Sequence, residues 1–105
     1  EYHEAALAID RDIGDKRGEG ADLGNLGIAY YSLGEVRKAI EYYEAALAID
    51  RDIGDKRGES IRLENLGHAF LSLGEYAAAE ERYRQAIQIA DEISLSEMKN
   101  WANWG

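Results

Sequence analysis

The chain of 105 residues has no cysteine and no proline, and it has fewer basic than acidic side chains. The absence of cysteine excludes a disulfide framework and a thiolate metal site, and it suits a reducing, cytoplasmic location. No apolar run approaches the roughly 20 residues that a membrane helix requires, and no secretory signal opens the chain. With proline absent and alanine, leucine, isoleucine, glutamate and tyrosine abundant, the composition favours helix.

Acidic side chains dominate the charge, because 21 aspartate and glutamate residues against 12 lysine and arginine residues give a formal net charge of -9. A chain this acidic repels phosphate groups, so nucleic acids and anionic membrane surfaces are poor partners. Basic or amphipathic peptides and basic protein surfaces are better candidates. The hydrophobic content of 46% is ordinary for a globular protein, so a disordered chain is not expected.

The sequence repeats itself with a period of 40 residues. The segment EYHEAALAIDRDIGDKRGEG at 1–20 returns as EYYEAALAIDRDIGDKRGES at 41–60, and the two differ at only two of twenty positions. The segments that follow, 21–40 and 61–80, share ten of twenty positions, and a third copy begins at Glu81. Such repetition is typical of arrays in which each unit packs on its neighbour.

Each copy is predicted to form two antiparallel helices. Apolar residues recur at three- and four-residue steps, as in Leu23, Leu26 and Tyr30, which is a helical spacing. The turns carry a glycine followed by an acidic residue, as at Gly54 and Asp55, where glycine ends one helix and aspartate caps the next. Turns this short force consecutive helices to run antiparallel. The predicted helices lie near 2–13, 17–33, 36–53, 57–73 and 76–92, with a shorter sixth helix from about residue 95.

A fixed set of positions in both copies resembles the signature of the tetratricopeptide repeat family. The matching residues are Leu23, Leu26, Gly27, Tyr30, Ala39, Tyr43 and Ala46, and then Leu63, Leu66, Gly67, Phe70, Ala79, Tyr83 and Ala86. The resemblance implies an all-α fold in which antiparallel helix pairs stack into a right-handed α-solenoid. The repeat is longer than the usual one of about 34 residues and lacks its proline. This long form is similar to the arrays of Pins/LGN-type adaptors, kinesin light chains and certain bacterial regulators.

The resemblance divides the chain into a partial repeat, two whole repeats and a second partial repeat. Residues 1–13 match the second helix of a repeat, and the last residues match the middle of a first helix. A window cut from a longer array, or an engineered chain, is therefore expected. Ser94 and Glu97 are suited to a capping box that opens the last helix. The boundaries are 1–15, 16–55, 56–93 and 94–105.

Two glycines, Gly27 and Gly67, fall in the middle of predicted helices, where glycine costs about 1 kcal/mol relative to alanine. A cost of this kind indicates that another helix approaches the backbone closely. In the first repeat we expect the small residues Ala39 and Ala46 at the crossing, with Tyr30 and Tyr43 filling the space beside it.

Catalysis and metal binding are not expected. The two histidines, His3 and His68, do not form an H-E-x-x-H pair. The aspartates Asp10, Asp12 and Asp15 recur 40 residues later beside arginine and lysine, and a solvated, charge-balanced connection is the simplest interpretation. The serines have no histidine at a matching spacing, and no G-x-x-x-x-G-K phosphate loop occurs. We therefore predict no catalytic residue, no metal ligand and no cofactor.

The one functional constellation is a binding surface on the first helices, which line the concave face of a stacked array. In peptide-binding members of the family, an asparagine placed like Asn25 and Asn65 bonds the ligand backbone, and an amide suits this role because it donates and accepts. The alternative is that these asparagines bond a neighbouring helix. No lysine stands on this face, so capture of a terminal carboxylate is not expected. The predicted peptide-binding residues are Asn25, Ile28, Tyr31, Ser32, Ile61, Glu64, Asn65, His68, Leu71 and Ser72.

A scaffold that binds a peptide or a partner protein is the function that the resemblance implies. The alternatives are a structural or designed module without a ligand, and a sensor array within a larger signalling protein. Leu95, Met98, Trp101 and Trp104 fit a partner-binding motif or, more simply, the packing stripe of the last helix. Apolar residues at both ends of the chain, with Tyr2 at the first, lead us to expect end-to-end homo-oligomers.

Overall fold

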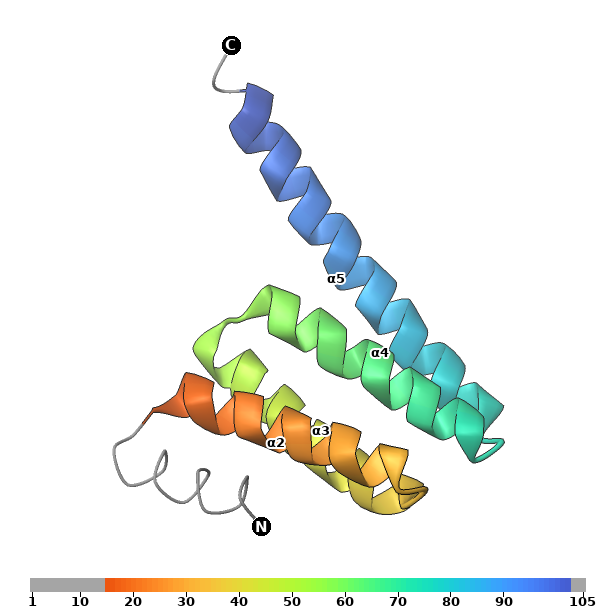
Figure 1. Cartoon of the computed structure of the whole chain (residues 1–105). Coiled ribbons are helices and arrows are strands. Elements are labelled where there is room, and N and C mark those ends of the chain that lie inside the picture. Colours follow the sequence, from red (N-terminus) through yellow and green to blue (C-terminus); the bar gives the residue numbers. More distant parts are fainter. Residues whose placement is uncertain (1–14, 103–105) are drawn as a thin grey trace.

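The computed structural model describes residues 15–102, with side chains described as far as Met98, and every regular element in this part of the chain is a helix. The helices are α2 (Lys16–Ser32), α3 (Val36–Ile53), α4 (Lys56–Ser72) and α5 (Tyr76–Ala102). Figure 1 shows two antiparallel pairs, α2 with α3 and α4 with α5, and α4 also packs on α3. The predicted all-α fold of stacked helix pairs is confirmed. The helix predicted at 2–13 lies outside the described residues.

Glycine and aspartate make the turn between the two pairs. Gly54 ends α3 with a φ of 74°, a left-handed conformation that a residue without a side chain adopts at little cost. Asp55 then begins α4, and its carboxylate accepts a hydrogen bond of 3.0 Å from the backbone N–H of Gly58. Asp15 caps α2 in the same way. The turn predicted from the sequence is therefore confirmed, with the aspartate satisfying a backbone donor at the start of the helix.

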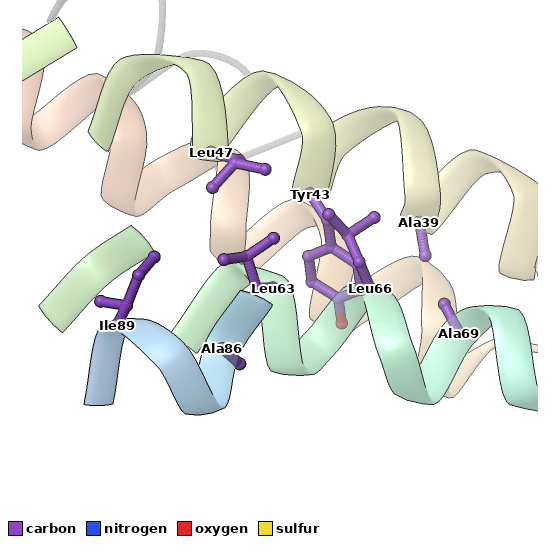
Figure 2. Packing of buried hydrophobic residues seen from close by; sticks show 8 residues of the cluster. All are labelled: Ala39, Tyr43, Leu47, Leu63, Leu66, Ala69, Ala86 and Ile89. Atoms are coloured by element: carbon purple, nitrogen blue, oxygen red, sulfur yellow. The ribbon is translucent and has the colours of Figure 1, made fainter. Parts of the chain in front are cut away.

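The main core joins α3, α4 and α5. Leu63 and Leu66 of α4 are 0% exposed and pack against Tyr43 and Leu47 of α3. Figure 2 shows these side chains pointing into the space between the helices. Burial of each such leucine contributes roughly 1.5–3 kcal/mol, so this layer holds the second pair on the first. The buried members of the cluster are Ala39, Tyr43, Leu47, Leu63, Leu66, Ala69, Ala86 and Ile89.

Tyrosine rings cover the glycines in the middle of α2 and α4. A Cβ added at Gly27 would lie 2.6 Å from Cδ1 of Tyr43, and one added at Gly67 would lie 2.6 Å from Cε1 of Tyr83. The predicted close approach is therefore present. Ala39 is fully buried near the crossing, as expected, but the group that requires a glycine is the tyrosine ring of the second helix.

The separate sixth helix predicted from about residue 95 is wrong, because α5 continues without a break to Ala102. Ser94 therefore lies inside α5 and opens no helix, and Glu97 forms an ion pair with Arg57 of α4. The physical reason lies at the turn position. One repeat period before Ser94 stands Gly54, whose left-handed conformation ends α3. Serine does not readily adopt that conformation, so the helix continues.

Candidate functional site

The predicted binding residues lie on one face of α2 and one face of α4, the first helices of their pairs. Residues three and four apart share a helix face, which places Ile28 with Tyr31 on α2. Ile28 and Leu71 are each 48% exposed. The surface thus presents apolar side chains to solvent among polar ones. The other members, all exposed or half-buried, are Asn25, Tyr31, Ser32, Ile61, Glu64, Asn65, His68 and Ser72. We call these ten residues the α2/α4 face.

A hydrogen bond between repeats joins the two halves of this face. The hydroxyl of Tyr31 on α2 lies 2.6 Å from Oγ of Ser72 on α4. Ser72 donates its own hydroxyl proton to the backbone carbonyl of His68 at 3.1 Å. Tyr31 is therefore the donor to Ser72, since a serine hydroxyl has only one proton. The bond fixes the position of the Tyr31 ring relative to the second repeat.

The rings of His68 and Tyr83 are in contact next to this bond. The two rings meet edge to face, with centroids 5.5 Å apart and an interplanar angle of 71°. Burial raises the pKa of the Tyr83 hydroxyl above its ordinary value, and the nearby carboxylate of Glu64 raises it further. Tyr83 therefore remains a neutral phenol at neutral pH and can still donate a hydrogen bond. Tyr83 was expected only as a residue of the repeat signature, and its edge-to-face contact with His68 was not predicted.

Asn25 and Asn65 are the two amides of the α2/α4 face. Asn25 is exposed and Asn65 is half-buried. Within the part of the chain that the structure describes, neither side chain makes a hydrogen bond to a neighbouring helix. Among the described helices, these amides therefore do not join one helix to another.

The charged connection between the pairs is only partly solvated. Asp52 is exposed, as expected, but Asp50 is 6% exposed and Glu59 is 8% exposed, so the prediction of a wholly solvated cluster is wrong for this turn. Glu59 accepts a 3.0 Å hydrogen bond from Nε of Arg51 and lies 3.6 Å from Nζ of Lys56. The described residues contain no group of three or more acidic or histidine side chains placed to hold a metal ion. Among them, too, no helix is long and apolar enough to cross a membrane.

A cavity that the sequence analysis did not predict opens between the start of α4 and the second half of α5. Its volume is about 510 Å³, and Arg57 pairs with Glu97 at its edge. Ile61, a member of the α2/α4 face, lines the adjoining hollow. The cavity exists because α5 continues past the start of α4. In the sequence, the feature that indicates this continuation is Ser94, which takes the place of the turn glycine. It is lined by Arg17, Gly54, Asp55, Lys56, Arg57, Glu92, Ile93, Ser96 and Glu97.

Helix α5 exposes several large apolar side chains within the described part of the chain. Ile87 stands one repeat period after Leu47; Leu47 is 2% exposed in the core cluster with Leu63 of α4, whereas Ile87 is 62% exposed. Leu95 and Met98 are 55% and 67% exposed. No described residue therefore covers the packing stripe that was predicted to include these two residues. We call Ile87, Leu95 and Met98 the α5 stripe; the side chains of the two tryptophans lie outside the described residues.

Comparison with known families agrees with this architecture. A family model described as a tetratricopeptide repeat matches residues 1–52 and 23–92, which together cover most of the chain. The match is to the repeat family in general, so the similarity to long-repeat arrays stays a prediction. A search of curated proteins finds no match to the chain. Proteins of the matched family are scaffolds of a non-catalytic type that mediate protein–protein interactions. The chain belongs to the tetratricopeptide repeat family.

Proposed function

We propose that the α2/α4 face binds a peptide segment of a partner protein, and that this segment is net basic or amphipathic. The observation that carries the proposal is the 2.6 Å hydrogen bond between Tyr31 and Ser72, which makes one surface from residues of two repeats. Ile28 and Leu71 lie one turn or less from that bond and are half exposed. A cysteine-free chain of this kind suits work in the reducing cytoplasm.

Each part of the face has a role in this proposal. Ile28 and Leu71 give apolar contact, which provides most of the free energy in peptide recognition. Asn25 and Asn65 hold the main chain of the peptide, because an amide can donate to a carbonyl and accept from an N–H. Glu64 and the net charge of -9 favour a cationic ligand and repel an acidic one.

The proposal is tested by binding to an array of amphipathic lysine-rich peptides, with scrambled and glutamate-rich peptides of the same length beside them. The wild-type chain should retain the amphipathic basic peptides. The Asn25→Ala/Asn65→Ala variant should lose that binding, while Asp52→Ala, on an exposed position of α3, should keep it. If the wild-type chain binds none of the peptides, the chain is a structural module. If both variants bind equally, the ligand lies elsewhere.

We also propose that the α5 stripe mediates association between copies of the chain. The observation that favours this second function is the contrast between Ile87 and Leu47, equivalent positions that are 62% and 2% exposed. An apolar stripe of this kind is stabilised when another helix covers it. Sedimentation at rising protein concentration should show oligomers, and Ile87→Ser should reduce them. Leu33→Ser is the matched control, because Leu33 is 72% exposed but stands alone at a turn. A chain that stays monomeric into the millimolar range would refute this association.

A further inference from the structure

Arg62 of α4 lies in a slot between the two repeats. Its guanidinium covers Gly24 of α2, where an added Cβ would lie 2.4 Å from Cζ of Arg62. Its Nε lies 3.8 Å from Oδ2 of Asp50 on α3. The Arg62 and Asp50 side chains are only 16% and 9% exposed. One arginine of the second repeat therefore contacts both helices of the first repeat.

The contact between Arg62 and Asp50 is poorly suited to adding stability. At 3.8 Å the pair is too long for a hydrogen bond, and both Asp50 Oδ2 and Arg62 Nε are buried without a hydrogen-bond partner. Removing two charges from water is costly, and a buried pair of this kind adds little net stability relative to apolar residues. Burial raises the pKa of the Asp50 carboxyl, although the Arg62 guanidinium lowers it. The pair therefore needs a role other than holding the helices together.

The similarity of the two repeats creates such a need. Helices α2 and α4 are identical at ten of 17 aligned positions, including the core leucines Leu23 with Leu63 and Leu26 with Leu66. Apolar contacts alone thus distinguish poorly between them, and repeats this similar are prone to incorrect assembly. The position of Arg62 is a clear difference, because the residue there in α2 is Asp22.

We propose that Asp50 and Arg62 determine which first helix packs on α3, accepting α4 and rejecting α2 of a second copy. With α2 in the place of α4, Asp22 would face Asp50, and two carboxylates buried side by side repel each other. Among the described second helices, the position equivalent to Asp50 on α5 is Ala90, so this selection acts on α3 and not on α5. The surface of α3 therefore selects a first helix that carries arginine at the position of Arg62.

The first test changes α2 alone. Asp22→Arg gives α2 the charge that α3 accepts, and Asp52→Arg makes the same change of charge at an exposed position of α3. Each chain is unfolded in urea and refolded at high concentration, and its oligomers are measured by size-exclusion chromatography with light scattering. Asp22→Arg should raise the oligomer fraction about tenfold over Asp52→Arg, since a like-charge contact of more than about 1.4 kcal/mol would have been removed. Equal fractions in the two variants would overturn the proposal.

The second test separates specificity from stability. Arg62→Met leaves Asp50 buried without its cation and should lower the urea midpoint, and Asp50→Ala/Arg62→Met should restore it. The double variant should nevertheless form more oligomers on refolding than the wild-type chain. Arg37→Met is the matched control, because Arg37 and Glu75 are also 3.8 Å apart but are 74% and 45% exposed. A double variant that refolds as cleanly as the wild-type chain would also overturn the proposal, because the pair would then select nothing.

Discussion

The ring of Tyr43 lies directly against Gly27, so that even a methyl group at residue 27 would come within 2.6 Å of ring carbon Cδ1. The same pair recurs one repeat later between Tyr83 and Gly67. The two rings differ, however, in the space that they have to move. Tyr43 is 3% exposed in the core, whereas Tyr83 is half-buried at the open side of α5.

This difference gives a prediction for two matched substitutions. Gly27→Ala should destabilise the chain by about 1–3 kcal/mol, because the buried Tyr43 ring cannot move away from the new methyl group. Gly67→Ala should lower the free energy of unfolding by less, because the Tyr83 ring has solvent to move into. Gly67→Leu should be severely destabilising, because its side chain is much larger. The measurement is the free energy of unfolding in urea, with Asp52→Ala as a near-neutral surface control. Equal costs at Gly27 and Gly67 would contradict the structural difference between the two rings.

A second prediction concerns the start of α4. Asp55→Ala should lower stability by about 0.5–2 kcal/mol, because the N–H of Gly58 loses its side-chain acceptor. Asp55→Asn should keep most of the stability, since an amide oxygen also accepts this bond. Glu35 stands at the equivalent position before α3 but makes no capping hydrogen bond with its side chain. Glu35→Ala should therefore change the thermal unfolding midpoint little, and a loss as large as that of Asp55→Ala would argue against the cap.

Much of the fold could be predicted because the same helix and turn patterns occur in both repeats. The leucines of α2 and α4 recur at helical spacing, and Gly54 with Asp55 marks a turn by local chemistry alone. The end of α5 could not be read in this way. Ser94 takes the place of the turn glycine, and the helical pattern of the sequence then continues through the expected break.

The candidate site was only partly predictable, for a different reason. Spacing along one helix places Ile28 beside Tyr31, but the bond from Tyr31 to Ser72 depends on how two repeats stack. The burial of Asp50 depends on the same stacking, because its cover comes partly from Arg62, 12 residues further along and on another helix. Residues that look like a solvated charge cluster in sequence therefore include one that is buried.

A third prediction concerns pH. The pKa of the Asp50 carboxyl is raised above 3.8, chiefly by burial, so the folded state binds its proton more tightly than the unfolded state. Stability contributed by Asp50 is therefore greatest below the unfolded pKa, and it is lost as pH rises from that value through the raised folded pKa. Relative to Asp50→Asn, the wild-type chain should lose unfolding free energy as the pH rises above about 4, the ordinary pKa of an aspartate.

The control for the pH experiment is Asp52→Asn, because Asp52 is exposed in the wild-type chain. The stability of this variant should follow the wild-type curve over the same pH range. A constant difference between the wild-type chain and Asp50→Asn at every pH would mean that burial does not raise the pKa of Asp50.

A fourth prediction concerns the rate of ligand association. The net charge of -9 should speed the approach of an amphipathic lysine-rich peptide. Raising the ionic strength from about 0.01 M to about 0.15 M shortens the screening length from about 30 Å to about 8 Å and should slow association. Stopped-flow fluorescence measures this rate. Glu64→Gln should weaken the salt dependence more than Glu80→Gln, since Glu80 lies outside the α2/α4 face. A salt-independent rate would contradict a cationic ligand.

Binding of a peptide at the α2/α4 face can be observed by NMR titration of the ¹⁵N-labelled chain with the best-retained lysine-rich peptide. We expect the largest amide and side-chain shifts on α2 and α4, with the amide groups of Asn25 and Asn65 among them and α3 nearly unchanged. Shifts confined to the α5 stripe, or to the cavity beside Arg57, would contradict this expectation and place the binding surface at the other end of the repeat.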